Sequence, residues 1–249
     1  MNHLTSPGRA LVKRQQIEHE LGVLTVNELG MMLSQVRADV RGALQAPVLL
    51  AAGAKHSNEP FTLGSVLGAW ANVVEVIKVW LGKTGPSDAF LAAVVQRLAN
   101  SALPAVIYDS ARAVLTTSVE KGWDATATRE ALNAALSIDT ASTAVTVDGL
   151  VPSGTSWKAI AERIARTEAT AVAAHTALND LAAFGYAEKR WVAHHDEFTR
   201  ADHLAADGQV VPTASTFSVG GYAMMAPGDP SAPLMQTVNC RCSVVAVTR

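Results

Sequence analysis

Apolar residues at helical spacing fill the first 137 residues and limit the fold more than any other feature. In residues 27–46 they recur every three or four positions, at Leu29, Leu33, Val36, Val40 and Leu44. This spacing places them on one face of an amphipathic helix. Aromatic residues make up only 5% of the chain, and alanine, the best helix former, supplies much of the apolar share. We expect helices over residues 8–21, 27–46, 61–82, 88–101, 104–121 and 125–136.

The helical pattern stops after residue 137 and resumes in a different form. Residues 138–156 are rich in Ser, Thr, Gly and Asp, which predicts a linker with a short strand near 144–147. A long helix is expected over 157–184, where Gly185 ends it. Short β-branched runs follow, and the last one, at 238–247, predicts a closing strand. The sequence therefore predicts a mostly helical α+β protein, with a helical region at 1–137 and a small α+β domain at 157–249.

Charge and targeting signals exclude several classes of protein. The net charge is −2, and Lys/Arg and Asp/Glu are balanced in both parts of the chain, so no basic footprint for nucleic acid is visible. The first residues lack the apolar core of a signal peptide. The most apolar stretch, 61–82, contains Asn72, Glu75 and Lys78, which favours a buried helix of a soluble protein over a membrane span. Two cysteines only two positions apart form no disulfide framework.

Arg166, Thr167 and Glu168 interrupt the apolar pattern of the long helix. Three successive positions cover most of a helix circumference, so at least one of these side chains must face the core or its edge. One interpretation is a solvated face with a single paired residue. The other is a buried ion-paired network, which needs partners because burial removes water from the charges. We expect those partners in the next polar motif.

That motif holds Asp196, Arg200 and His203, spaced so that they share one face if the segment is helical. Thr199 and Asp202 resemble a capping pair, so a turn that enters a helix is the competing geometry. Three interpretations stay open: a polar structural network, a metal site and a catalytic site.

Cys240 and Cys242 flank Arg241, and in a strand both thiols would face inward while the arginine faces away. With His203 they offer three zinc ligands, and His194, His195 or Asp196 could supply a fourth. Buried cysteines packing as small apolar residues are the simpler interpretation. A third is a nucleophilic Cys240 activated by His203 and oriented by Asp196. The glycine motifs VGG at 219–221 and PGDP at 227–230 match no nucleotide-binding fingerprint and predict turns.

Taken in order, these pieces resemble the phage Mu F-like family of minor head proteins, also called phage head morphogenesis proteins. The resemblance covers roughly residues 150–245: I-A-R-T-E on a helix, a Trp after basic residues, a D-G turn, an aromatic before Gly, a P-G-D-P turn and N-C-R-C. The matching residues are Arg166, Thr167, Glu168, Trp191, Asp196, Arg200, His203, Gly208, Phe217, Pro227, Gly228, Asn239, Cys240, Arg241 and Cys242. Phe198 departs from the pattern, because relatives usually carry Arg there.

The resemblance implies a minor structural component of a tailed-phage head that is not an enzyme. It would act in head morphogenesis near the portal vertex and in DNA packaging or ejection. Such a protein would be assembled in the host cytoplasm and would lie in the head interior or at the portal vertex. Its partners would be the portal protein and capsid or scaffold proteins, with weak contact to packaged double-stranded DNA and none to membranes. Residues 1–137 would dock on portal or capsid.

The polar residues would then hold the small domain together. This expected structural network comprises Arg166, Glu168, Asp196, Arg200, His203 and Arg241, with no cofactor unless His203, Cys240 and Cys242 bind a structural zinc ion. The alternatives are a metal-dependent or thiol enzyme that uses Asp196, His203, Cys240 and Cys242, and a non-specific DNA-binding module.

Overall fold

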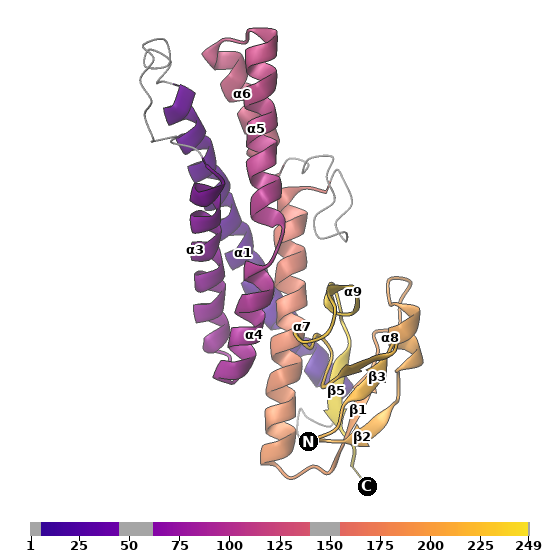
Figure 1. The fold of residues 1–249 in the computed structure, drawn as a ribbon. Helices are drawn as coiled ribbons and strands as arrows, with labels where there is room; N and C mark the ends of the chain where they lie inside the picture. Colours follow the sequence, from indigo (N-terminus) through magenta and orange to yellow (C-terminus); the bar gives the residue numbers. More distant parts are fainter. Residues whose placement is uncertain (1–5, 45–61, 140–154, 249) are drawn as a thin grey trace. The chain divides into compact units, whose positions relative to one another are not determined.

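The computed structural model describes residues 6–44, 62–139 and 155–248. Helices dominate, and short antiparallel strands follow the last long helix (Figure 1), so the expected α+β class is confirmed. The helices are α1 (Pro7–Leu44), α3 (Leu63–Gly82), α4 (Asp88–Ala99), α5 (Leu103–Lys121), α6 (Ala125–Leu136), α7 (Trp157–Ala183), α8 (Ala201–Ala205) and α9 (Leu234–Thr237). The strands are β1 (Glu188–Val192), β2 (Val210–Pro212), β3 (Phe217–Val219), β4 (Tyr222–Met224) and β5 (Ser243–Ala246).

Two helix ends lie close to where the sequence places them, because a residue within one turn caps or ends the helix. The Asp124 carboxylate accepts a hydrogen bond from the Ala127 amide at 2.7 Å and caps α6. Gly185 follows α7 with a φ of 71°, the left-handed conformation that glycine adopts readily at a helix C-terminus.

The first two expected helices, 8–21 and 27–46, form one continuous helix from Pro7 to Leu44, and residues 45–46 lie outside the described part of the chain. The expected break at residues 22–26 is wrong because the buried stripe continues through it: Leu21, Thr25 and Leu29 are all fully buried at four-residue spacing. The Thr25 hydroxyl donates to the Leu21 carbonyl at 2.7 Å, which satisfies this polar group inside the helix.

The described residues form two compact units. Unit 1 takes residues from Met1–Thr25, Ile77–Arg97 and Glu162–Arg249, and unit 2 from Val26–Val76 and Leu98–Ala161. Both units thus combine segments from before and after the predicted linker. The division at 138–156 stays a prediction, and residues 140–154 of that segment, with the short strand expected there, lie outside the described residues.

Unit 2 is helical, and its buried tryptophans bond to the carbonyls near helix ends. Trp70 Nε1 donates to the Leu98 carbonyl at 3.0 Å, and Trp157 Nε1 donates to the Ala135 carbonyl at 2.9 Å. A buried indole thus satisfies both its own N–H and a carbonyl that the helix leaves unpaired.

Two segments are long and apolar enough to cross a membrane by length and composition, namely Leu63–Gly82 and Asp88–Ser118. The share of buried residues in their most apolar windows is 28% and 33%. Core helices of water-soluble proteins meet the same criterion, so the expectation that 61–82 packs inside a soluble protein stays a prediction.

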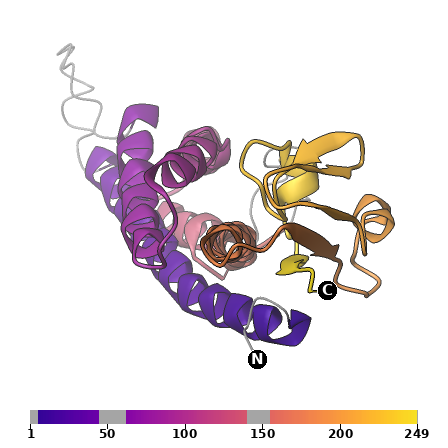
Figure 2. The ribbon, with the colours of Figure 1, turned by 90° about the horizontal axis from the view of Figure 1, so that it is seen from below.

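Unit 1 contains the strands. The order β2-β1-β5 forms an antiparallel sheet in which Arg190 pairs with Val210 and Trp191 with Val244. Strands β3 and β4 form a hairpin, and its turn residues Gly220 and Gly221 both have positive φ, as expected from the VGG motif. Figure 2 looks nearly along α7 and shows these strands gathered on one side of it. The core between them includes the fully buried rings of Trp191 and Phe217.

Candidate functional site

The predicted site residues all lie in unit 1, but they form separate clusters and no single network. The helix α7 supplies Arg166, Thr167 and Glu168. The others lie in the turn after β1, in α8, and in the turn between α9 and β5. Cys240 and Cys242 precede β5, so the expectation that they lie in a strand is wrong. The extended pairing begins only at Ser243, and Asn239 has a φ of 56°, which ends any strand there.

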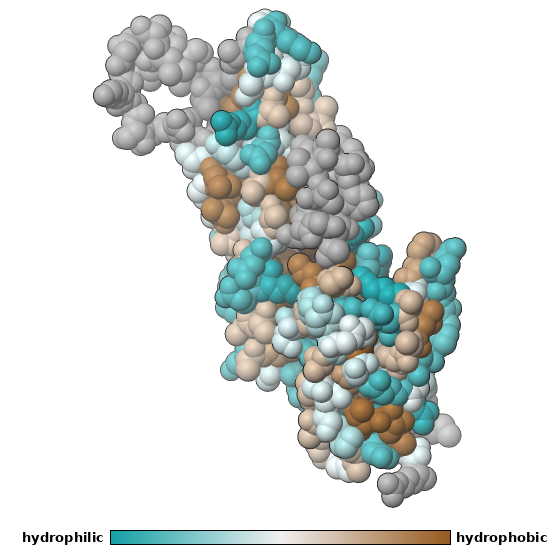
Figure 3. All heavy atoms as spheres, turned by 45° about the vertical axis from the view of Figure 1, so that its right-hand side comes forward, coloured by the Kyte–Doolittle hydropathy of each residue, from teal (hydrophilic) through white to brown (hydrophobic). Residues whose placement is uncertain are grey.

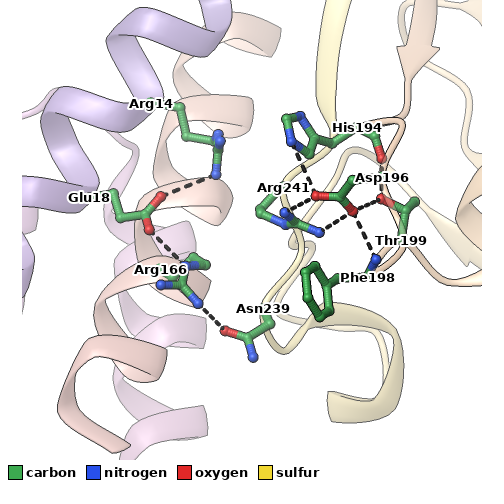
Figure 4. Close-up of polar contacts among 9 residues, drawn as sticks. All are labelled: Arg14, Glu18, Arg166, His194, Asp196, Phe198, Thr199, Asn239 and Arg241. Atoms are coloured by element: carbon green, nitrogen blue, oxygen red, sulfur yellow. Dashed lines mark hydrogen bonds and ion pairs between the residues drawn. The ribbon is translucent and has the colours of Figure 1, made fainter. Parts of the chain in front are cut away.

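The first cluster fixes the turn at Asn239 onto α7 and α1 (Figure 4). Arg166 donates from Nε to Glu18 at 2.7 Å and from Nη1 to the Asn239 side-chain oxygen at 3.1 Å. The Asn239 amide in turn donates to the Thr167 hydroxyl at 3.0 Å. Arg14, which is 3% exposed, also contacts Glu18 at 3.2 Å. Two consecutive residues of α7 therefore hold the backbone just before the cysteines.

The second cluster is a buried ion pair between α7 and α4. Glu168 and Arg97 are 2.5 Å apart, and their side chains are only 2% and 8% exposed. Arg97 also donates to the Gly228 carbonyl at 3.4 Å. The buried alternative for this motif is therefore the observed one. The expectation that its partners lie in residues 196–203 is wrong, because α4 and α1 cover these positions of α7 instead.

Asp196 forms the third cluster, at the start of the turn after β1. Both carboxylate oxygens accept hydrogen bonds from Arg241, with Nη2 to Oδ1 at 2.6 Å, and Thr199 also donates to it. The bond from Arg241 is the main cause that lowers the pKa of Asp196 to about 2. His194 Nε2 lies 3.4 Å from the same carboxylate (Figure 4).

Arg200 does not pair with Asp196, so the expected row along a helix face is wrong. Helix α8 begins only at Ala201, with Arg200 as its N-cap residue, and the competing geometry of a turn entering a helix is the observed one. Arg200 instead donates to the Val238 carbonyl at 2.5 Å. Arg200 therefore binds the residue next to Asn239 and adds a second contact to the same turn.

Phe198 occupies the position where the family pattern has arginine. Its side chain is 76% exposed, and the Arg241 guanidinium carbon lies 5.9 Å from the ring centroid. The ring thus gives Arg241 a cation–π contact, where the arginine of the family pattern would add a second positive charge.

His203 and the two cysteines form the fourth and most buried cluster. All three residues are at most 2% exposed, and His203 Nδ1 lies 3.4 Å from Cys242 Sγ and 3.6 Å from Cys240 Sγ. The other ring nitrogen, Nε2, lies 3.2 Å from the Gln236 oxygen. The predicted triad that uses Asp196 to orient His203 is therefore wrong, since Gln236 takes that place and Asp196 binds Arg241.

The two thiols differ in their acidity because they influence each other. A hydrogen bond from Cys240, supported by His203, lowers the pKa of Cys242 to about 5. The same bond and complete burial raise the pKa of Cys240. One sulfur of the pair therefore carries charge more readily than the other.

Sequence reasoning missed Lys189, Gln236, Glu18 and Arg97. Lys189 is fully buried in β1, where it donates to the Met225 carbonyl at 2.8 Å and lies 5.0 Å from the Phe217 ring centroid. Burial lowers the pKa of its amine to about 8. Its position two residues before Trp191 predicts that the two side chains point to the same buried face, because alternate residues of a strand share one face. Nothing in the sequence points to Gln236, Glu18 or Arg97.

Comparison with known proteins identifies one family. The family model described as phage Mu protein F like protein matches residues 109–245, more than half of the chain. The match includes α7, strands β1 to β4, residues 243–245 of β5 and every site residue that the sequence singled out. No curated protein and no solved structure gave a match.

Proposed function

Because the chain belongs to the phage Mu protein F like family, we propose that it is a minor structural component of a tailed-phage head that acts near the portal vertex. Family membership supports a phage head morphogenesis protein and a virion component. The match over residues 109–245 is the observation that carries this proposal. The narrower role at the portal, with a part in packaging or ejecting DNA, goes beyond the family and needs its own test.

The site's contacts support a structural role over an enzymatic one. Arg166, Arg200 and Arg241 direct their guanidinium groups to a turn or to carboxylates of the same unit. His203 is 1% exposed and both cysteines are 2% exposed, which leaves little surface for a substrate. The alternative of a thiol or metal-dependent enzyme also lacks its expected contact between Asp196 and His203. We therefore propose that these residues maintain the fold of unit 1.

Exposed apolar residues in the helical region suggest where a partner could bind. Leu63 and Leu67 lie one turn apart on α3 and are 39% and 48% exposed. Figure 3 shows one face of the molecule, where apolar and polar residues alternate over short distances. We propose that the helical region contacts portal, capsid or scaffold protein through such residues. Contact with packaged DNA would be weak, since the net charge is −2, and no membrane partner is proposed.

The proposal is tested by co-expressing the full chain with the portal protein of the same phage, followed by affinity capture and gel filtration. We expect a complex that elutes with a fixed ratio of the two chains. Mass spectrometry of purified heads measures incorporation independently. A protein that neither binds portal nor is found in heads would contradict the proposed role.

Point variants are better than a deletion for locating the contact. Deleting residues 1–137 would remove Glu18 and Arg97, the partners of Arg166 and Glu168, and would damage unit 1 itself. Replacing Leu63 and Leu67 by Gln should weaken capture while leaving the thermal stability nearly unchanged, because surface changes rarely exceed about 0.5 kcal/mol. Leu204→Gln, at 40% exposure in unit 1, is the matched control that should retain capture.

A further inference from the structure

The buried cluster of His203, Cys240 and Cys242 has the chemistry of a site for a thiophilic metal ion. One ligand atom from each residue lies within 4.8 Å of the others, and all three side chains are buried. We propose that His203 Nδ1 and the two Sγ atoms bind one divalent zinc ion, which joins α8 to the turn before β5. This proposal is independent of the role in the phage head, and either can fail alone.

A chain of hydrogen bonds sets the histidine ring in the form that binds metal. The Asp202 carboxylate can only accept, and Gln236 Nε2 donates to it at 2.9 Å. This fixes the orientation of the Gln236 amide, so its oxygen faces His203 Nε2 at 3.2 Å. Because the oxygen can only accept, Nε2 carries the hydrogen and donates it to this hydrogen bond. Nδ1 then carries the free lone pair, and it is this nitrogen that faces both sulfurs. Metal-binding histidines are typically held in this way by a partner on the other nitrogen.

The two nitrogen–sulfur distances agree with a tetrahedral zinc site. Zinc–sulfur bonds of about 2.3 Å and zinc–nitrogen bonds of about 2.05 Å at a tetrahedral angle put sulfur and nitrogen about 3.6 Å apart. The observed separations from Nδ1 are 3.4 Å to Cys242 and 3.6 Å to Cys240. A hydrogen bond accounts for one of these contacts, because Nδ1 of a neutral ring has a single lone pair and accepts from one thiol, while Cys240 hydrogen-bonds to Cys242. A cation between the three atoms accounts for both.

Charge and burial also agree with zinc. Two thiolates neutralise the two positive charges of the ion, so the complex carries no net charge into the core, where an uncompensated ion is costly. Trp191 packs edge-on against His203, with ring centroids 5.6 Å apart, and forms part of the apolar surroundings.

The fourth coordination position falls to water. Among the described residues, the ligands expected for it are otherwise engaged: Asp196 binds Arg241, His194 lies beside Asp196, and His195 lies 2.8 Å from Asp207. Cys242 also lines a small hollow together with Arg14 and Thr170. Three protein ligands and a water are the set typical of catalytic zinc, but all three ligands here are at most 2% exposed. Because this burial leaves no position open to substrate, we assign the ion a structural role.

The test uses the full chain, purified without chelator from cells grown with added zinc. Elemental analysis should find about one zinc per chain. After zinc removal, titration with cobalt(II) should produce thiolate-to-cobalt charge-transfer bands and the visible bands of a tetrahedral site, and added zinc should abolish them. Absence of stoichiometric zinc together with absence of thiolate bands would overturn the proposal.

Two variants separate ligand loss from damage to the fold. Cys240→Ala combined with Cys242→Ala should lose both zinc and the cobalt bands, whereas His195→Gln, at an exposed histidine, should keep both. Zinc retained by the double alanine variant would show adventitious binding and refute the site. Gln236→Met keeps every ligand but frees the histidine ring, so zinc affinity should fall about 10- to 100-fold. An unchanged affinity in this variant would contradict the orientation argued above.

Discussion

Replacement of Arg97 by methionine tests the buried ion pair, because it leaves the Glu168 carboxylate in the core without its partner. The two side chains are 8% and 2% exposed, so the value of about 0–1 kcal/mol for solvent-screened surface pairs does not apply. Removing one member of a buried pair costs about 3–5 kcal/mol. For a chain of this size the midpoint of thermal unfolding should fall by about 6–20 °C. The hydrogen bond from Arg97 to the Gly228 carbonyl is lost as well.

Urea denaturation of wild type, Arg97→Met, Glu168→Met and the double variant measures the effect as a double-mutant cycle. The double variant should be more stable than either single one, because two apolar side chains of similar length remove the uncompensated charge together with its partner. Additive losses would mean that the two residues do not interact. A loss below about 1 kcal/mol for Arg97→Met would show that water reaches the pair, and the structural argument would be refuted.

Three further predictions concern the other clusters. The pKa of Asp196 is about 2 in the fold and 3.8 ordinarily, so its contribution to stability is present above pH 3.8 and is lost as the pH falls toward 2. Asp196→Asn should therefore remove this part of the pH dependence of the unfolding free energy. An unchanged pH dependence between pH 2 and 4 would contradict the contact with Arg241. Lys189, lowered from 10.5 to about 8, binds its proton more tightly in the unfolded chain, so the unfolding free energy should rise between pH 8 and 10.5 in wild type but not in Lys189→Met. Gly220→Ala should destabilise the protein more than Gly221→Ala. Both glycines have positive φ, but only at Gly220 would an added Cβ meet side-chain atoms at 2.4–2.8 Å. Equal decreases in the midpoint of thermal unfolding would show that backbone strain alone matters.

Helices were predictable from the sequence because their signals are local. The Asp124 cap of α6 and the end of α7 at Gly185 each depend on residues within one turn of the helix. The continuous α1 was missed because Gly22 and Thr25 resemble an interruption, whereas the buried stripe that overrides them depends on what packs against the helix.

The polar clusters were predictable only in part, for the same reason. His203 meets both cysteines as the sequence suggested, since these are three residues with matching chemistry. Glu18, Arg97 and Gln236 lie far along the chain from the groups they bind, and no spacing rule relates them. Asp196 pairs with Arg241 and not with Arg200, because the intervening residues form a turn.

Unit 1 is assembled from three stretches that are far apart in the chain, and this has a consequence for its synthesis. The bond from Arg166 to Glu18 joins residues 148 positions apart, and the pair of Arg97 and Glu168 spans 71. All residues of unit 2, Val26–Val76 and Leu98–Ala161, are synthesised before Glu162 is added. The contact of Glu18 with Arg166 can therefore form only after the last stretch has emerged. A chaperone, or the ribosome surface itself, would have the longest access to Ile17 and Leu21 during that interval.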